Sequence, residues 1–596
     1  HSPGVMDVVT AVDIPGSNNI NIFNDDEYVF TPLGGKIECC GQALALVLAD
    51  SQEHATAGAL KLQAEGITYD TESLGKPILS LEEAIKSKNF FSLPSEVPFM
   101  MTKGNSDIDA ALAAAPHTLS GTIDCASEKH FYMETQRAFV KPLEGGEGLD
   151  VLVSTQDLDM TQQTIAKVMG VPCNQIIGKM IRAGGGFGGK ATRQLPVACA
   201  AAIAASKHSR PVKVVNERCD DMIMVAGRER AKVEYSVGFD DNGKILAFKE
   251  IFYMDAGFTS RESQGDLGMA CFMADNTYNI PNWRSQAYLC KTNNQTNCSM
   301  RAPGVVHSIH VMERVVESIA NYLPHITPVQ VRASNFYKAG DATPYLQILD
   351  ETPTLVRTWE EVQKSAGFVN LQASVAQFNK DNTWTKRGVS LIPVKYGMQE
   401  GGYNMEAAVH IYPDGSITVV HGGMEIGQGI NTKVAQCCAF ALSAPLESVR
   451  VANPSTVKIA ASGGTGGSAT SECCCAAVIM ACDIINSRLA PYKSKFDAWT
   501  SIIAAASNDH VMLSASAQFS PKPYEGHQYR YFVWGSSISV VELDVLTGET
   551  QILRSDLVYD CGVSLNPAID IGQVEGAFVF GIGTFLSEEV VIDESN

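Results

Sequence analysis

Charged residues are scarce in this sequence, and basic residues are scarcer than acidic ones. Only 18% of the 596 residues are charged, and 45 Lys and Arg stand against 65 Asp and Glu, which gives a formal net charge of −20 at pH 7. Such a balance repels a phosphate backbone, and no basic run in the chain reverses it. We therefore expect no nucleic acid among the partners of this protein.

Metal-binding cysteine pairs and long apolar runs are also missing. The 16 cysteines occur as direct neighbours, such as Cys473 to Cys475, or singly, and no two of them have Cys-x-x-Cys spacing. This pattern argues against zinc and iron–sulfur sites and is typical of the reduced cysteines of a cytoplasmic protein. The longest apolar stretches, such as Cys473 to Cys482, fall short of the roughly 18 residues that a membrane span needs. We expect no membrane among the partners.

The sequence does contain a mixture of strand and helix patterns. Turn residues predict three β-hairpins, at residues 241–243, 413–415 and 546–548. Apolar residues at three- and four-residue spacing predict helices, among them residues 53–65, 161–169, 195–207, 308–323 and 476–489. Because hairpins and helices alternate along the chain, we expect an α+β (mixed) fold.

Turn-rich segments near positions 95 and 340 divide the chain into residues 1–95, 96–340 and 341–596. The first residue is His1, and an alternating apolar segment begins as early as Val5. This is typical of a chain that starts in mid-domain, so we expect the first unit to be partial.

The glycine-rich run at residues 184–190, Gly-Gly-Gly-Phe-Gly-Gly-Lys, formally matches two nucleotide-binding motifs. A phosphate loop needs Ser or Thr after the Lys, and this sequence has Ala191 there. A dinucleotide fingerprint needs an acidic residue about 20 positions further on, and residues 206–210 supply none. Neither motif holds, but the glycines allow main-chain amides to approach an anionic group closely.

Similar runs occur at residues 422–429, 462–468 and 572–576. A single glycine run more often marks a turn than a ligand site. Four such runs, three of them with amide or hydroxyl side chains, suit a large ligand rich in hydrogen-bond acceptors. A pterin with a phosphate tail is a ligand of this kind.

These runs also carry a resemblance to a known family. The matching segments are residues 153–156 (VSTQ), 184–193 (GGGFGGKATR), 422–433 (GGMEIGQGINTK) and 560–577 (DCGVSLNPAIDIGQVEGA). Their order and spacing resemble the molybdopterin-binding domains of the xanthine dehydrogenase and aldehyde oxidase family, preceded by part of an α/β hammerhead domain. The resemblance implies a molybdenum hydroxylase with molybdopterin as its cofactor, and a homodimer.

The resemblance also implies roles for individual residues near the metal. Gln156 would hydrogen-bond an oxygen on molybdenum, Gly186, Phe187 and Gly188 would lie against the ligands of the metal, and Arg301 would sit beside the centre without binding the metal directly. Taken without the family, Gln156 is more easily read as a surface amide and Arg301 as a member of a surface ion pair.

Further residues are implied as contacts of the pterin. The main chain of Gly466 and Gly467 would run alongside the cofactor, and the Gln428 side chain would bind the pterin. We expect residues 184–190, 422–429 and 463–468 and Gln156 to meet at one buried cavity.

The substrate pocket departs from that of the xanthine dehydrogenases. In those enzymes a Glu after the Lys of the glycine loop and an Arg 32 residues before the equivalent of Arg301 grip the purine, and here these positions hold Ala191 and Met269. At a position where the family has an aromatic residue, this sequence has Pro303. Losing these two charged side chains costs on the order of several kcal/mol in the binding free energy of a purine. The pattern therefore resembles an aldehyde oxidase, which converts aldehydes to carboxylic acids, with a pocket that favours bulky apolar aldehydes over purines.

Several parts of the family's enzymes have no counterpart in this sequence. Their 2Fe-2S and FAD domains would precede His1, and their catalytic Glu, in a Gly-Glu-Pro-Pro setting, would lie beyond Asn596. Without that base the reaction loses roughly 10² to 10⁴ in rate, so we expect this chain alone to be weakly active or inactive. If a base lies within the chain, Glu425 and Glu575 are the first candidates.

Two classes of function stay open at this point. The first is a molybdenum hydroxylase that oxidises aldehydes with water as the oxygen source and passes electrons to iron–sulfur and flavin centres. The second is a catalytically inactive homologue that reuses the fold as a structural or binding protein. Molybdenum analysis would separate them.

Overall fold

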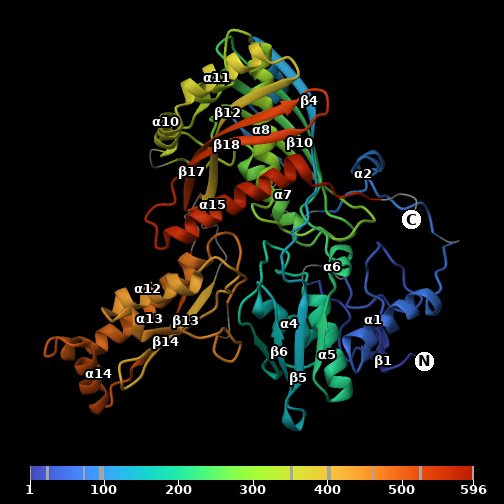
Figure 1. The fold of residues 1–596 in the computed structure, drawn as a ribbon, viewed down its shortest axis with the longest axis vertical. Helices are drawn as coiled ribbons and strands as arrows, with labels where there is room; N and C mark the ends of the chain where they lie inside the picture. The colour runs from blue at the N-terminus through green and yellow to red at the C-terminus, as the bar shows by residue number, and fades with distance from the viewer. Residues whose placement is uncertain are drawn as a thin grey trace.

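The chain folds into β-sheets that are covered by helices and grouped in three lobes (Figure 1). The structure is a computed structural model, and it describes residues 2–592 except 22–23, 25, 72–73, 93–99, 350–352, 399–403, 460–461 and 522–526. The described part contains five sheets, of which the first has two strands and the others three to five.

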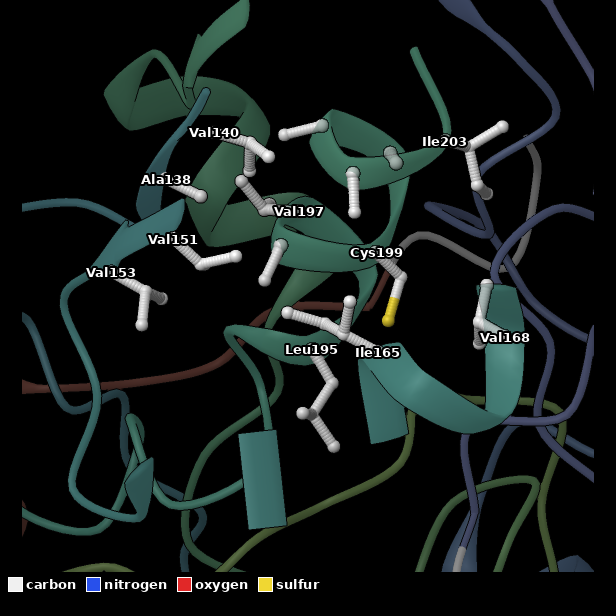
Figure 2. Packing of buried hydrophobic residues seen from close by; sticks show 14 of the residues in the cluster. Ala138, Val140, Val151, Val153, Ile165, Val168, Leu195, Val197, Cys199 and Ile203 are labelled. Atoms are coloured by element: carbon white, nitrogen blue, oxygen red, sulfur yellow. The ribbon is translucent and has the colours of Figure 1, made fainter. Parts of the chain in front are cut away.

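One lower lobe, coloured cyan to green in Figure 1, carries the glycine loop. Its four-stranded sheet has the order β7 (Ile176–Lys179), β6 (Leu149–Val153), β5 (Arg137–Pro142), β8 (Val212–Val215). Helices α4 (Leu158–Met169) and α5 (Leu195–His208) pack on it. Figure 2 shows apolar side chains of β5 and β6 directed at those of α4 and α5.

Local signals explain where these two helices begin and end. Asp157 caps α4 by accepting a hydrogen bond from the Met160 amide at 2.8 Å, and Gly170 ends it with φ of 67°. Helix α5 has Pro196 in its first turn. Leu195 and residues 197–205 of α5 are all buried, which is why this helix is apolar on every side.

The N-terminal piece packs beside this lobe. It pairs β1 (Val5–Val9) with β2 (Leu46–Ala49) and places α1 (Gln52–Lys61) against them. Its Glu27 side chain, 8% exposed, forms ion pairs with Arg193 and Arg261. A buried carboxylate thus joins the N-terminal piece to two distant parts of the chain.

The upper lobe holds two sheets and the helices that cover them (Figure 1). The larger sheet has the order β3 (Met100–Lys103), β11 (Asn282–Cys290), β10 (Ile245–Asp255), β9 (Ala231–Phe239), β4 (His117–Cys125), with only β10 and β11 parallel. The second is the antiparallel sheet β12 (Thr385–Met398), β17 (Tyr531–Asp544), β18 (Thr550–Tyr559). Their helices include α7 (Ser263–Met273), α8 (Val305–Tyr322), α10 (Leu355–Ala366) and α11 (Phe368–Asp381).

The third lobe, orange in Figure 1, is a four-stranded sheet under long helices. The strand order is β15 (Val449–Val451), β14 (Ile417–His421), β13 (Met405–Ile411), β16 (Ser514–Phe519). The covering helices are α12 (Ile430–Leu442), α13 (Thr470–Lys493) and α14 (Trp499–Asn508). The remaining helices of the chain are α2 (Leu81–Ser87), α3 (Ile108–Ala113), α6 (Arg218–Met224), α9 (Pro328–Asn335) and α15 (Pro567–Ile582).

The α+β prediction and its three hairpins are confirmed. Residues 241–243 join β9 to β10, residues 413–415 join β13 to β14, and residues 546–548 join β17 to β18, all as antiparallel pairs. The five predicted helices correspond to α1, α4, α5, α8 and α13, and α13 begins six residues earlier than predicted. The predicted boundary near residue 95 lies outside the described residues.

The expectation about apolar length is wrong for two helices. Residues 470–493 (α13) and 567–587 (α15 with the turn after it) are long and apolar enough to cross a membrane by length and composition. Further apolar residues, separated by scattered polar ones, continue the helix beyond the uninterrupted apolar run at 473–482 and keep its average hydropathy high. In the structure α13 is a core helix, with Cys473, Ala477 and Ala481 fully buried and packed against β13 and β16.

Replacing Glu27 by Gln should lower the free energy of unfolding in urea by about 3–5 kcal/mol, because it leaves two buried guanidinium groups without their counter-charge. Burial alone would raise the pKa of Glu27, but Arg193 and then Arg261 lower it to about 2. The carboxylate therefore stabilises the fold at neutral pH, and this stabilisation is lost only as the pH falls from about 4 toward 2.

The matched control is Glu83→Gln, which breaks the exposed pair with Lys76 at 3.2 Å. Its expected cost is about 0–1 kcal/mol. Equal losses in the two variants would show that the buried pair does not hold the N-terminal piece.

Candidate functional site

A cleft of about 3400 Å³ lies where the three lobes meet. Its lining includes Gln156 and residues of all four glycine-rich runs. The three runs and Gln156 that were expected to meet therefore do border one space, but this space is an open cleft and not a buried cavity. Helix α15 crosses this region between the upper lobe and the lobe of α12 and α13 (Figure 1).

The glycine loop at residues 184–190 lies at the edge of the cleft in a conformation that requires glycine. Gly185 has φ of 89° and Gly188 has φ of 107°. A Cβ at Gly188 would lie 1.8 Å from the carbonyl oxygen of Ser299. The loop therefore packs main chain against main chain, and this contact turns Phe187 (φ 57°) to the cleft.

The Gln156 side chain joins this loop to another one. Its Oε1 accepts hydrogen bonds from the amides of Gly188 at 3.0 Å and Lys190 at 3.2 Å, and its Nε2 donates to the carbonyl of Thr465 at 3.0 Å. Gln156 is 4% exposed. Because Nε2 carries two hydrogens, one remains for a ligand in the cleft.

Thr465 joins the run at residues 462–468 to the run at residues 422–429, and Glu425 orders the latter run. The Thr465 hydroxyl accepts from the Met424 amide at 2.7 Å. The Glu425 carboxylate accepts from the amides of Gly427, Gly429 and Asn431 at 3.0–3.3 Å and so caps α12. Its role is structural, and the suggestion that Glu425 is a base finds no support here.

Gln428 lies in the same loop and lines the cleft. Its Oε1 accepts from the Ile426 amide and its Nε2 donates to the Met424 carbonyl, both at 2.8 Å. The side chain is therefore held in place before any ligand binds, with one Nε2 hydrogen left over.

Lys190 of the glycine loop does not face the cleft. It is fully buried, and its Nζ donates to Glu134 at 2.9 Å and to Ser154 at 3.0 Å. Burial raises the pKa of Glu134, but the Gly184 amide, Ser154 and Lys190 together lower it. This lysine fixes the loop from behind, unlike the lysine of a phosphate loop.

Arg301 lies in the cleft and contacts helix α15. Its Nη2 donates to the carbonyl of Gln573 at 2.7 Å and to Oε1 of Gln573 at 3.0 Å. Phe580, one further residue of α15, packs edge-on against Phe187 with ring centroids 4.9 Å apart. Burial lowers the pKa of Arg301, and its guanidinium carbon lies 5.9 Å from the centroid of the Phe580 ring.

Sequence reasoning identified the run at residues 572–576 as a glycine motif and missed its glutamine. Gln573 and Phe580 line the cleft, whereas Glu575 is exposed and does not. Three- and four-residue spacing along a helix that begins at Pro567 would have separated these faces. Glu575 is thereby ruled out as a base in the cleft.

The substrate side of the cleft is apolar. Ala191, Met269 and Pro303 all line it. The Tyr529 hydroxyl lies 3.2 Å from Sδ of Met269, and the same region is lined by Phe272, Ile309, Tyr396 and Phe532.

Gly186 is the one residue predicted to contact the cofactor or substrate that does not line the cleft. A Cβ there would lie 2.6 Å from Oε1 of Gln156. Gly186 therefore makes room for the glutamine rather than for a ligand, while Gln156, Phe187, Gly188, Arg301, Gln428, Gly466 and Gly467 all border the cleft.

Asp157, next to Gln156 in the sequence, also lines the cleft. Burial raises its pKa to about 6, against the lowering effect of the Met160 amide. Its Oδ2 lies 2.8 Å from where a Cβ on Gly464 would stand, so Gly464 is needed for the capping residue of α4 to fit.

Three family models match this chain. The model of the aldehyde oxidase and xanthine dehydrogenase a/b hammerhead domain matches residues 1–72. Two molybdopterin cofactor-binding domain models match residues 90–336 and 361–596.

Curated relatives match over nearly the whole chain. A xanthine dehydrogenase/oxidase of Felis catus is 38% identical over 605 aligned residues, which cover 99% of this chain and 44% of the relative. An aldehyde oxidase 3 of Rattus norvegicus is 36% identical over 601 residues, with 99% and 44% covered. The chain thus spans less than half the length of these relatives.

Solved structures share the fold. An aldehyde oxidoreductase from Desulfovibrio desulfuricans superposes with a TM-score of 0.88 at 22% identity, covering 100% of this chain and 66% of the other. A reconstituted CO dehydrogenase from Oligotropha carboxidovorans gives 0.86 at 20% identity, with 99% and 80% covered.

Replacing Gly186 by Ala should displace the Gln156 side chain and break its hydrogen bonds with the Gly188 and Lys190 amides. The expected cost is about 1–3 kcal/mol, because two buried amides lose their acceptor. Thermal unfolding measures it, with Gly75→Ala as the control, since a Cβ there meets nothing within 4 Å. If the two variants unfold at the same temperature, the Gln156 contacts do not hold the loop.

Proposed function

Because this chain belongs to the aldehyde oxidase and xanthine dehydrogenase family of molybdenum hydroxylases, we propose that it is the cofactor-binding portion of an enzyme that oxidises aldehydes to carboxylic acids. The observation that carries the proposal is the convergence of Gln156, Arg301, Gln428 and the glycine loop on one cleft with an apolar substrate side. An inactive homologue would have no physical reason to keep these polar groups in place.

The residues of the cleft fit molybdopterin. At Gly427 and Gly466 a Cβ would meet no atom within 4 Å, so the backbone stands open to the cleft at both points. Gln156 and Gln428 each retain an amide hydrogen for an acceptor. Gly466, Gly467 and Gln428 would hold the pterin, while Gln156, Phe187, Gly188 and Arg301 would border the metal.

When bound, the molybdenum centre supplies a two-electron oxidation with water as the source of oxygen. The chain itself holds charged and polar side chains in position and excludes water from them. Arg301, held by Gln573, offers a fixed cation to an oxygen atom that gains negative charge. The Phe580 ring lies against that cation, with its centroid 5.9 Å from the guanidinium carbon, and this apolar surface strengthens the electrostatic effect of the cation.

Overall identity does not choose between the two branches of the family, since xanthine dehydrogenases and aldehyde oxidases match almost equally well. The pocket favours aldehydes. Ala191 and Met269 offer no charge to a purine, and the aromatic side chains beside Met269 offer apolar contact to a bulky aldehyde.

Other features of the proposal concern the whole enzyme. Electrons would pass to 2Fe-2S and FAD centres outside this chain, and the enzyme would act in the cytoplasm as a homodimer. Aldehydes would be its small-molecule substrates, with neither nucleic acid nor membrane involved.

The protein purified from a host that makes molybdopterin should contain molybdenum, and Gly466→Ala should lose most of it while keeping its thermal unfolding temperature. Without the cofactor there is room for the added methyl group, but the bound cofactor would leave no room for it. The control is Gly388→Ala on β12, where a Cβ would meet no atom within 4 Å. This variant should keep both its molybdenum and its unfolding temperature. Molybdenum-free protein from that host would favour the inactive homologue.

The double substitution Ala191→Glu with Met269→Arg should shift preference from benzaldehyde toward xanthine by about 30-fold or more in relative kcat/KM, because each restored charged side chain contributes about 1–3 kcal/mol to purine binding. The assay uses an enzyme completed with its further domains and compares both substrates. Xanthine turnover by the unmodified enzyme as fast as benzaldehyde turnover would contradict the proposed specificity.

A further inference from the structure

Two buried carboxyl groups lie behind the segment that carries Arg301. Glu229, just before β9, is 0% exposed, and Asp266, on α7, is 3% exposed. The Ser263 hydroxyl donates to Oε1 of Glu229 at 2.7 Å, and the Ser299 hydroxyl donates to Oδ1 of Asp266 at 2.6 Å. Each carboxyl group therefore has one satisfied oxygen.

The second oxygen of each group has no donor in the described part of the chain. These are Oε2 of Glu229 and Oδ2 of Asp266, both shielded from solvent. The two side chains also lie within hydrogen-bonding reach of one another. Two carboxylates cannot hydrogen-bond, and two buried negative charges in contact repel each other strongly. One shared proton satisfies both oxygens and removes one charge.

No neighbouring charge offers an alternative to this proton. Arg228, beside Glu229, is the nearest guanidinium, and it is already paired with Glu128 at 3.1 Å. The other titratable groups facing the pair are Glu262, Cys298 and His307. Glu262 adds negative charge, burial raises the pKa of Cys298, and burial keeps His307 neutral by lowering its pKa to about 3.

We propose that Glu229 and Asp266 share one proton and act as a positioning pair for Arg301. Asp266 holds the Ser299 hydroxyl, and Ser299 is two residues before Arg301. The Arg228 guanidinium, on the other side of Glu229, donates to the carbonyls of Met300, Arg301 and Ala302 at 2.9–3.3 Å. The segment that presents Arg301 is thus fixed from behind at four successive residues.

The backbone of this segment needs such anchoring. Ala302 has φ of 55°, in the left-handed region that a residue with a side chain rarely adopts. The Ser299 carbonyl also closes against Gly188 of the glycine loop. A shift of Ser299 would therefore move both Arg301 and Gly188, which border the metal in the proposed function.

The shared proton makes stability depend on pH in a defined direction. Burial and then the charge of Glu229 raise the pKa of Asp266 well above its usual value, and burial raises the pKa of Glu229. The folded protein therefore holds a proton that the unfolded chain releases above about pH 4. The stability contributed by the pair is complete below that pH and is lost as the pH rises.

Infrared spectroscopy with ¹³C-labelled Asp and Glu tests the proton directly, and it does not depend on cofactor or activity. Purified protein near neutral pH should show the carbonyl band of a protonated carboxylic acid. Asp266→Asn and Glu229→Gln should each fold and lose that band, because an amide hydrogen replaces the shared proton while the net charge of the pair stays the same. Burial also raises the pKa of Glu250 to about 7, so Glu250→Gln is the control and should leave the band of the pair.

A second measurement compares thermal unfolding between about pH 5 and pH 8. The unfolding temperature of the unmodified protein should fall with rising pH by a few degrees more than that of either amide variant. Asp266→Leu, which releases Ser299, should lower molybdenum retention severalfold, whereas Asp266→Asn should keep it. This last readout rests on the proposed function, and the first two do not.

With Glu250 replaced by Gln in every sample, an acid band that survives in both amide variants, or no acid band when Glu229 and Asp266 are intact, would overturn the shared proton. Equal molybdenum retention in Asp266→Leu and Asp266→Asn, with the band behaving as expected, would overturn the positioning role alone. A protein that shows the band and its loss but never holds molybdenum would contradict the proposed function and leave the shared proton established.

Discussion

The contact between Gln156 and Thr465 is the interaction on which the site depends, because it joins parts of the chain 309 residues apart. The Thr465 amide also donates to the Gln156 carbonyl at 2.7 Å, so the two residues are linked in both directions. Through the Thr465 hydroxyl the link reaches Met424. Three of the four glycine-rich runs are thereby held around one cleft before a ligand binds.

The glycines do two different things in this arrangement. Gly186 and Gly188 have no side chain because a neighbouring glutamine or carbonyl takes that space, whereas Gly427 and Gly466 open the backbone to the cleft. A uniform sequence signal thus covers a packing role and a binding role. Only the surroundings of each glycine separate the two.

Several buried charged side chains position the site without lining the cleft. Glu27 holds Arg193 and Arg261, Lys190 holds the glycine loop from behind, and Arg228 holds the segment of Arg301. Each is paired and hydrogen-bonded, which is the condition for burying a charge without a large loss of stability. Arg301 and Lys433 are the cationic side chains among these loops that reach the cleft.

The sequence by itself determined the fold class, the hairpins, the main helices and the family, because turn residues, apolar periodicity and motif order are local properties of the chain. It also identified the loops that meet at the cleft. Only the tertiary structure decided that Gly186 serves Gln156, that Glu425 caps α12, and that Gln573 rather than Glu575 faces Arg301. It alone brought Glu229 and Asp266 together. These outcomes depend on contacts between segments far apart in sequence, and local pattern carries no information about such distances.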